Sequence, residues 1–277
     1  MCRNWVLAAT AVALCMTPGV MQAKDKGKDK DKDKPAAASA APAPRVKATP
    51  AERAMAARGD PLARAAFWAR QAEIDPGDTE AAVGLSQALR ALGSYDDAVA
   101  TIEKALLAKP DSFEALMELA RIHVARGRGF YAVAPARRAQ ALAPKDWRPV
   151  TLLAVAYEQA QRDEEAVAAH RQALAMAPDN PIVLSNYAMF LASHGEPARA
   201  EAMLRTAAAR PDSTIQVRQN LALVLGLEGR LQESEKLARQ DLPPEVVANN
   251  LAYLRSAAGE PEPVGAGRSW ESLRGAP

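Results

Sequence analysis

The strongest constraint on the fold of this chain is a spacing of 34 residues that several residue types share. Prolines follow it at Pro76, Pro110, Pro144 and Pro178. Glycines follow it at Gly59, Gly93, Gly127, Gly195 and Gly229, and Gln161 stands where the series would place one more. Alanines keep the same step at two positions of the frame, which are Ala98, Ala132, Ala166 and Ala200, and Ala105, Ala139, Ala173 and Ala207. A fixed period of this size indicates one supersecondary unit that is built several times in series.

Each unit has the pattern of two helices joined by a turn. Glycine tolerates the left-handed backbone that closes a helix, so the recurring glycines mark the turn inside a unit. Proline lacks an N–H and cannot continue a helix, so the prolines mark the link to the next unit. Aromatic residues make up only 5% of the chain, and no segment shows the apolar alternation of a strand. The sequence therefore predicts an all-α fold of stacked hairpins, since one hairpin alone cannot bury its apolar face.

Six units can be placed in this frame, and the first and the last depart from its pattern. They begin near Arg45, Thr79, Phe113, Trp147, Pro181 and Ile215. Small residues are expected where the two helices of a unit cross, but the first unit carries Arg64 and Gln71 at such positions. The sixth unit carries Ser234 and Asp241 there. Variation of this kind is expected of terminal repeats, which face solvent on one side.

The two ends of the repeat region carry helix signals of their own. Thr49–Glu52 has the sequence of a capping box and predicts the start of a short first helix. Near the other end, residues 245–255 place Val247, Leu251 and Leu254 on one face. We expect this last helix to cover the exposed end of the stack, which a solenoid requires for solubility. The predicted solenoid extends over residues 49–255.

A helix–turn–helix repeat of this length, with Gly, Pro, Leu and small residues at these positions, resembles the tetratricopeptide repeat (TPR) family. The resemblance implies a solenoid of five to six repeats in which the first helix of each unit lines a concave groove for a partner protein. Two rows of side chains are predicted to face this groove. The first row is Val83, Met117, Thr151, Ser185 and Gln219, and the second row is Gln87, Arg121, Val155, Met189 and Leu223.

The two rows mix apolar and hydrogen-bonding side chains, which suits an extended segment or a helix of a partner protein. The Lys/Arg/Asn cluster with which chaperone-binding TPR proteins grip a C-terminal carboxylate is missing, so a partner of that type is disfavoured. For each single residue, packing or plain solvent exposure is an equally good explanation. The prediction concerns the groove as a whole.

The segments outside the solenoid have the composition of targeting and spacer sequences. Residues 1–23 show the layout of a secretory signal peptide, because Arg3 precedes an apolar stretch that is too short to span a membrane. Residues 24–48 are Lys/Asp-rich and then Ala/Pro-rich, which predicts a disordered linker. Residues 256–277 are expected to be a disordered tail, although Trp270 and Leu273 in RSWESLR could form a short docking motif.

Both cysteines of the chain, Cys2 and Cys15, lie inside the predicted signal peptide. Cleavage after Ala23 would therefore leave a mature protein without thiols. Lipidation of Cys15 is the alternative, but Leu14 stands where lipoprotein signals carry a small residue. We expect the protein in the periplasm, and attached to a membrane only if Cys15 is lipidated.

No pattern in the chain predicts catalysis, a metal site or a cofactor. His123, His170 and His194 belong to different units and lack ligands at metal-binding spacing. Neither a P-loop nor a nucleophile elbow is present. The net charge of +2, with both signs interleaved, does not indicate a nucleic-acid partner. The prediction is a non-enzymatic binding protein without cofactors, with an enzyme kept as the remote alternative.

The C-terminal segment resembles one particular group of TPR proteins. Residues 214–255, with NLALVLGLEGR, DLPPE and NNLAYLR, are similar to the end of the TadD-type proteins of the tight-adherence (Flp) pilus system. The resemblance implies a scaffold of the cell envelope that assembles or localises the pilus machinery, acts like a pilotin and binds an outer-membrane secretin. The alternative is a general periplasmic adaptor in envelope biogenesis that is unrelated to pili.

Overall fold

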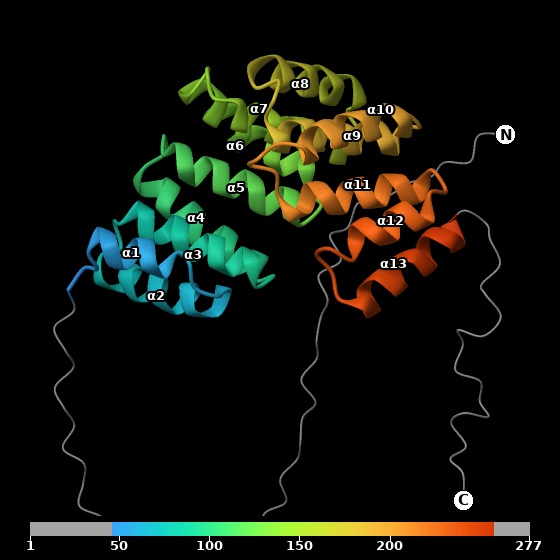
Figure 1. Cartoon of the computed structure of the whole chain (residues 1–277). Helices are drawn as coiled ribbons and strands as arrows, with labels where there is room; N and C mark the ends of the chain where they lie inside the picture. Colours follow the sequence, from blue (N-terminus) through green and yellow to red (C-terminus); the bar gives the residue numbers. More distant parts are fainter. Residues whose placement is uncertain (1–45, 258–277) are drawn as a thin grey trace, which may run out of the picture.

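The computed structural model describes residues 46–257 (Figure 1), and this part of the chain is entirely helical. The predicted signal peptide with Cys15, nearly all of the predicted linker and the Trp270 motif lie outside the described residues. The helices are α1 (Pro50–Ala56), α2 (Pro61–Ile74), α3 (Thr79–Ala91), α4 (Tyr95–Ala108), α5 (Phe113–Ala125), α6 (Gly129–Leu142), α7 (Trp147–Gln159), α8 (Asp163–Met176), α9 (Pro181–Ser193), α10 (Pro197–Ala208), α11 (Ile215–Leu227), α12 (Leu231–Ala238) and α13 (Pro244–Ala257).

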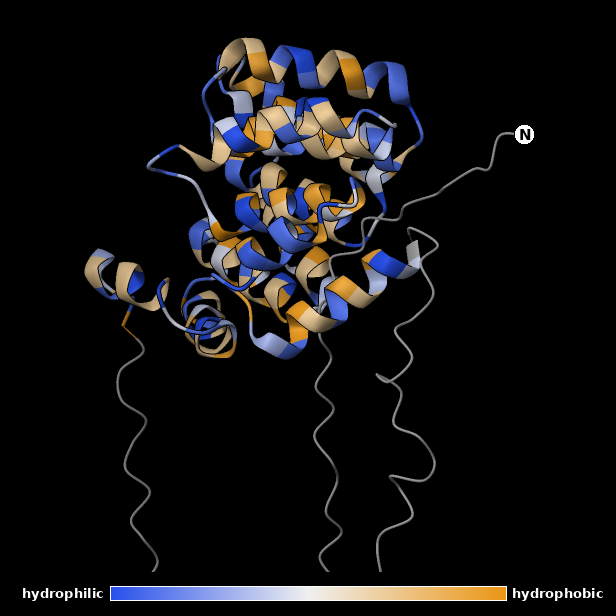
Figure 2. Cartoon of the chain, turned by 45° about the vertical axis from the view of Figure 1, so that its right-hand side comes forward, coloured by the Kyte–Doolittle hydropathy of each residue, from blue (hydrophilic) through white to orange (hydrophobic). Residues whose placement is uncertain are grey.

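The helices form six successive hairpins and a final single helix. Figure 1 shows the hairpins stacked in chain order along an arch, with α1–α4 on one side of an opening and α11–α13 on the other. In Figure 2 hydrophilic and hydrophobic segments alternate along individual helices, as expected when one stripe of each helix is buried. The predicted all-α solenoid with a C-terminal capping helix is confirmed.

The turns of the second to sixth units follow the predicted glycine chemistry, whereas Gly59 in the first unit does not adopt a positive φ. Gly93, Gly127, Gly195 and Gly229 have φ angles between +69° and +82°. Gln161, which occupies the glycine position of the fourth unit, is forced into the same conformation with φ +57°. In these five units the residue after the turn donates its N–H to a carbonyl five residues earlier at 2.8 to 2.9 Å, as in Arg128 to His123 and Arg162 to Tyr157. This is the hydrogen bond of a Schellman motif, so the helix ends where its carbonyls find that partner.

The links between units are equally regular. The residue before each of the four frame prolines is extended, with φ between −134° and −145°, because the proline ring disfavours helical backbone there. The next first helix then begins at an N-cap side chain that accepts a backbone N–H; these caps are Asp78, Ser112, Asp146, Asn180 and Thr214. Consequently the first helices begin at the five predicted residues from Thr79 to Ile215.

The small residues of the repeat lie where helices cross. Ala98, Ala132, Ala166 and Ala200 are fully buried in successive units. Two polar exceptions in the terminal units are satisfied by partners: Gln71 accepts the backbone N–H of Ala48 at 2.8 Å, and Asp241 accepts two bonds from Arg218 at 2.6 and 2.8 Å. At Gln71 and Asp241 hydrogen bonds therefore replace close packing, whereas the buried Nε of Arg64 has no such partner.

The last helix covers the end of the stack as predicted. Val247, Leu251 and Leu254 of α13 are between 1% and 5% exposed. α13 approaches α11 so closely that a Cβ added at Gly226 would lie 2.3 Å from a methyl carbon of Leu254. A larger residue at position 226 would therefore displace the Leu254 side chain. Between residues 46 and 257, no helix is long and apolar enough to cross a membrane.

Candidate protein-binding surface

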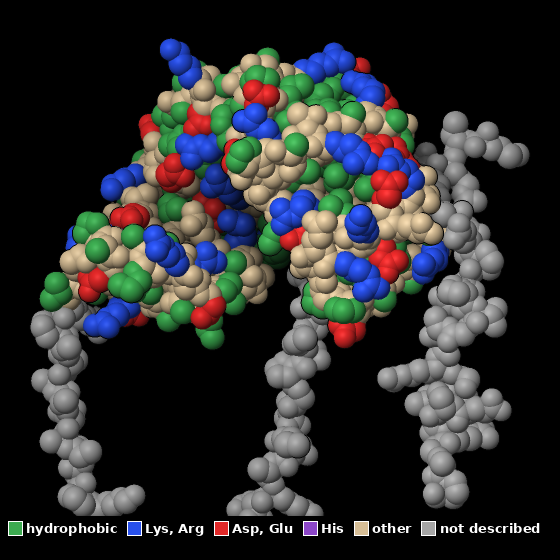
Figure 3. Space-filling view, in the orientation of Figure 1, with side chains coloured by type: hydrophobic (Ala, Val, Ile, Leu, Met, Phe, Trp, Pro, Cys, Tyr) green, Lys and Arg blue, Asp and Glu red, His purple; other side chains and the backbone are tan. Residues whose placement is uncertain are grey.

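The inner face of the arch is built from the first helices of the units. Consecutive first helices, α3, α5, α7, α9 and α11, pack against one another, whereas within residues 46–257 no second helix packs against the next second helix. The first helices therefore occupy the shorter circumference and the second helices the longer one, which makes the stack curve. Figure 3 shows the resulting hollow, with Lys or Arg side chains in blue inside it. We call the surface of these five first helices the inner face.

The first predicted row does not line the hollow, and the prediction for its buried members is wrong. Val83 is 9% exposed, and Met117, Thr151 and Ser185 are 1% to 4% exposed. They lie between consecutive first helices, where Ser185 Oγ accepts a hydrogen bond from Asn220 Nδ2 of the next unit at 2.9 Å. Only Gln219 keeps part of its surface. The sequence placed these residues on the correct side of the helix but did not show how closely the next helix approaches.

The second predicted row keeps access to solvent in all five units. Gln87, Val155 and Met189 are half-buried, and Leu223 is exposed. The side chain of Arg121 retains 31% of its accessible surface. These residues come from α3, α5, α7, α9 and α11 in turn, so they form one continuous track across the units. Their role in binding stays a prediction.

Sequence reasoning missed the charged residues behind this track. Glu118 on α5 is fully buried, and it accepts two hydrogen bonds from the Arg90 guanidinium of α3, from Nε at 2.7 Å and from Nη2 at 3.3 Å. The nearest nitrogen of Arg121 lies 3.8 Å from the same carboxylate. The other units carry Pro50, Gly84, Leu152, Asn186 and Asn220 at the position of Glu118. That mismatch within the frame was the only sequence signal of this cluster.

A second arginine cluster lies at the start of α7. Arg148 donates to Asp146 at 2.6 to 3.1 Å, and its guanidinium lies over the ring of Phe113 at 5.1 Å from the centroid. Hydrogen bonds from Arg148 hold the pKa of the Asp146 carboxyl below its usual value, and the charge of Arg121 acts in the same direction. The Asp146 carboxylate is therefore ionised and already committed to Arg148.

The C-terminal part of the inner face is uncharged by contrast. α9 contains no Asp, Glu, Lys or Arg, and the single charged residue of α11, Arg218, is paired with Asp241. Amide and hydroxyl groups replace the charges, as in the Asn220 contacts with Ser185 and with Gln216, both at 2.9 Å. The inner face thus changes from arginine-bearing at α3, α5 and α7 to amide-bearing and apolar at α9 and α11.

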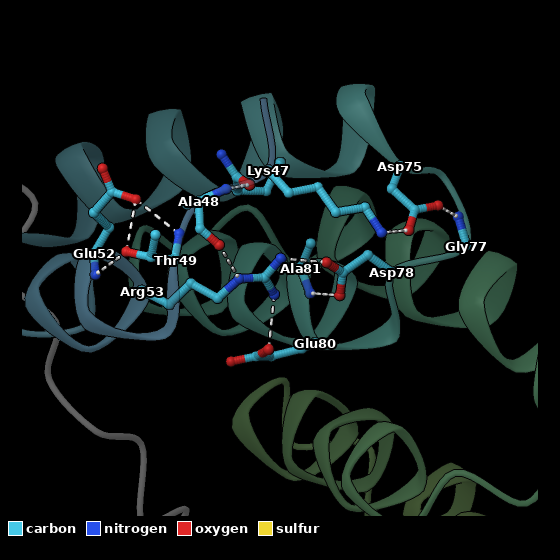
Figure 4. Close-up of polar contacts among 11 residues, drawn as sticks. Lys47, Ala48, Thr49, Glu52, Arg53, Asp75, Gly77, Asp78, Glu80 and Ala81 are labelled. Carbon is cyan, nitrogen blue, oxygen red and sulfur yellow. Dashed lines mark hydrogen bonds and ion pairs between the residues drawn. The ribbon is translucent and has the colours of Figure 1, made fainter. Parts of the chain in front are cut away.

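The N-terminal edge of the inner face carries a polar network that includes residues preceding α1 (Figure 4). Arg53 of α1 bonds to Asp78 at 2.5 Å and to Glu80 at 2.7 Å, and Lys47 bonds to Asp75 at 2.5 Å. We call these five residues the N-terminal clasp. A cavity of about 700 Å³ lies beside the clasp and the buried ring of Trp68.

Of the three histidines, His170 is a packing residue and His194 is the C-cap of α9. His170 is 1% exposed and stacks on Tyr187 at 5.1 Å, and burial lowers its pKa to about 4. It occupies the frame position of Trp68, Ile102, Ala136, Leu204 and Ala238, all of which are buried. His194 ends α9 and contacts Phe190, as His170 does, so the structure brings together two histidines that the sequence placed in separate units. In the described part of the chain, no three His, Cys, Asp or Glu side chains are grouped to hold a metal ion.

Comparison with known proteins agrees with this geometry. The family model described as "Tetratricopeptide repeat" matches residues 60–122 and 164–224. Over these residues the chain is similar to the tetratricopeptide repeat family. TPR proteins generally mediate protein–protein interactions, and their fold is that of a non-catalytic interaction scaffold.

Solved structures show the same TPR architecture. The chain is similar to TTC0263, a thermophilic TPR protein of Thermus thermophilus, with 27% identity over 64% of this chain and 98% of that chain and a TM-score of 0.57. It is also similar to a TPR protein of Parabacteroides merdae, with 14% identity over 75% and 86% of the two chains and a TM-score of 0.63. A search of curated proteins found no match.

Proposed function

We propose that this TPR protein is a non-enzymatic scaffold of the bacterial cell envelope whose inner face binds a segment of a partner protein. The observation that carries the proposal is the continuous second row, which keeps solvent access in five consecutive units, from Gln87 to Leu223. A track of this kind, with apolar and hydrogen-bonding groups mixed, suits a helix or an extended segment.

We assign the scaffold to the Flp pilus system, where it would assemble or localise secretion components as a pilotin does. The support is the resemblance of residues 214–255 to TadD-type proteins. That segment comprises α11, α12 and the start and middle of α13, so it includes the cap as well as part of the inner face. The expected partner is an outer-membrane secretin or another pilus export protein, and the expected compartment is the periplasm.

Deletion of the gene tests this assignment. The deletion strain should lose surface pili while pilin synthesis continues, and the wild-type chain supplied in trans should restore them. A variant with Arg121→Glu and Met189→Glu should fail to restore pili although it accumulates normally, because both residues belong to the second row. Arg138→Glu is the matched control, since Arg138 lies on the outer helix α6 and is exposed. Normal piliation in the deletion strain would refute the pilus assignment.

Two measurements separate the remaining alternatives. Mass spectrometry of the mature N-terminus should find a chain that begins at Lys24, whereas a diacylated Cys15 would mean membrane attachment. Cross-linking from a photoreactive residue at position 189 should capture a secretin or pilus-platform protein. Capture of cell-wall or outer-membrane biogenesis proteins would instead support the general periplasmic adaptor.

A further inference from the structure

Glu118 is a negative charge that the fold has buried completely within the inner face. Removing a carboxylate from water is costly unless a positive group and hydrogen bonds compensate for it. Arg90 provides both, because its fork donates two bonds to the two carboxylate oxygens. The buried acid and Arg90 therefore form a closed pair with no net charge.

Arg121 makes no hydrogen bond within this cluster. Its closest approach to Glu118 is 3.8 Å, which is too long for a hydrogen bond. The other nearby acid, Asp146, already accepts bonds from the side chain and the backbone N–H of Arg148. Within residues 46–257 no group accepts a hydrogen bond from Arg121, although its side chain is only 31% exposed. None of its nitrogens is a buried atom without a partner, so the donors of Arg121 that make no hydrogen bond in the protein are open to a ligand.

The surroundings of Arg121 define the group that would complete it. The guanidinium is permanently charged and presents a planar fork of donors, which matches a carboxylate. Its neighbours in the second row are Gln87 and Val155, which are uncharged, and the track continues to Met189 and Leu223 without any free charge. A ligand that fits this track has one acidic group at Arg121 and apolar or amide side chains toward α9 and α11.

We propose that the partner segment carries an Asp or Glu side chain that binds Arg121, and that Arg90 acts as a positioning residue by keeping Glu118 from occupying Arg121. This inference rests on the proposed function and deepens it by specifying the chemistry of the partner. The proposed ligand is a side-chain carboxylate within the partner segment and not the C-terminal carboxylate of the partner chain.

The test uses the purified protein from Lys24 onward and an array of 15-residue peptides from the periplasmic parts of the pilus secretin of the same cell. All peptides are amidated at the C-terminus, so that only side-chain carboxylates remain. Each is paired with a version in which Asn and Gln replace Asp and Glu. The bound peptides should lose about tenfold or more in affinity on this replacement, as expected for a charge-assisted hydrogen bond.

Protein variants then test the roles of Arg121 and Arg90 with the same peptide pairs. Arg121→Gln should lose the same factor toward the acidic peptide and nothing toward the amide peptide, whereas the control Arg138→Gln should bind both as the wild type does. Arg90→Gln should also lose the preference for acid, because Glu118 then turns to Arg121. Combining Arg90→Gln with Glu118→Gln should restore that preference. A merely structural role of Arg90 predicts no such rescue, and its absence would overturn the role assigned to Arg90.

The outcomes separate this inference from the pilus assignment. If secretin peptides bind but their acidic and amide forms bind equally well, or if no peptide shows an Arg121-dependent preference for acid, the inference is wrong. A second array that covers periplasmic proteins unrelated to pili is run in parallel. An Arg121-dependent preference found only in that array supports the inference and contradicts the pilus assignment.

Discussion

The two ends of the solenoid are closed in different ways. At the C-terminus, α13 buries Val247, Leu251 and Leu254 against the last hairpin. At the N-terminus, α1 has no buried residue and is held by the clasp, in which Arg53 pairs with Asp78 and Glu80. One end is an apolar lid and the other is a set of ion pairs.

The difference between the two ends follows from the length of the terminal helix, since α1 has 7 residues and α13 has 14. In the repeat frame α1 corresponds to the second half of a first helix, while Lys47 and Ala48, which correspond to the first half, precede the helix as non-helical backbone. A helix of seven residues cannot bury much apolar surface, and apolar burial stabilises in proportion to area. Polar contacts substitute for it, so the stability of the N-terminal end should depend on salt and pH while that of the cap should not.

The largest effect is expected at the cap. Leu251→Ala removes a side chain that is 5% exposed and should lower the free energy of unfolding by about 3 kcal/mol, from lost burial and the cavity left behind. Tyr253→Ala, on the exposed side of the same helix, should cost less than about 1 kcal/mol. Urea denaturation followed by circular dichroism measures both. Equal losses would mean that the cap is not held by its apolar face.

A nearly equal loss of stability is expected on acidification, and it originates at His170 in the C-terminal half of the solenoid. His170 is buried with a pKa of about 4 instead of 6.5. Below about pH 6.5 the unfolded chain therefore binds a proton that the folded chain does not, and stability falls until about pH 4, by about 3 kcal/mol in total. Stability is unaffected by this group above pH 6.5. Urea titrations at a series of pH values should show the loss, and His170→Leu should abolish it.

His194→Gln should reduce this pH dependence only in part, because burial is the main cause of the lowered His170 pKa and the charge of His194 is a smaller one. The clasp responds in a different range. Arg53 lowers the pKa of Asp78, so the contribution of this pair is present above pH 3.8 and is lost only as pH falls through the lowered pKa. Acidification should therefore loosen the region around α8 and α9 before it releases α1. Release of α1 first would reverse the comparison.

A smaller and local effect is expected at the clasp. Arg53→Gln breaks two ion pairs whose Arg53 and Asp78 side chains are only 11% and 12% exposed, and should destabilise α1 by about 1–2 kcal/mol. Hydrogen exchange should show faster exchange of the α1 amides and unchanged protection of α13. Added salt should reproduce part of this effect in the wild type. Lys47→Gln is the control, because Lys47 is 57% exposed and its pair should contribute little.

The smallest effect is expected midway between the ends, where the units are equivalent. Gln161 adopts the left-handed backbone at φ +57°, which is unfavourable for a residue with a Cβ. Gln161→Gly should raise the free energy of unfolding by about 1 kcal/mol. Gly127→Gln, at φ +69° in the preceding unit, should lower it by a similar amount. Opposite signs in thermal denaturation confirm that the turns are interchangeable although the ends are not.

Much of the fold could be predicted because its signals are local. Turn glycines, N-caps and prolines act on the backbone within one helical turn of themselves, so the starts of α3, α5, α7, α9 and α11 coincide with the predicted unit starts. The cap was predictable for the same reason, since Val247, Leu251 and Leu254 share one face by helical spacing alone. Residues 1–45 and 258–277 lie outside the described structure, so the predicted signal peptide and tail motif stay predictions.

The candidate site was predicted only in part. The correct helices and the second row followed from the frame, but Met117, Thr151 and Ser185 were wrongly expected to face the hollow. Arg90 and Glu118 lie 28 positions apart on different units, so no local sequence pattern predicts their ion pair.

Sequence alone is therefore sufficient for the period, the helix ends and the side of each first helix that turns inward, because each depends on residues close together in the chain. The packing of one unit against the next decided which inward side chains stay open, which acid is buried and which arginine is left without a hydrogen bond. Exposure and charge pairing are properties of two neighbouring units at once, and the distance between those units is set by all the side chains packed between them.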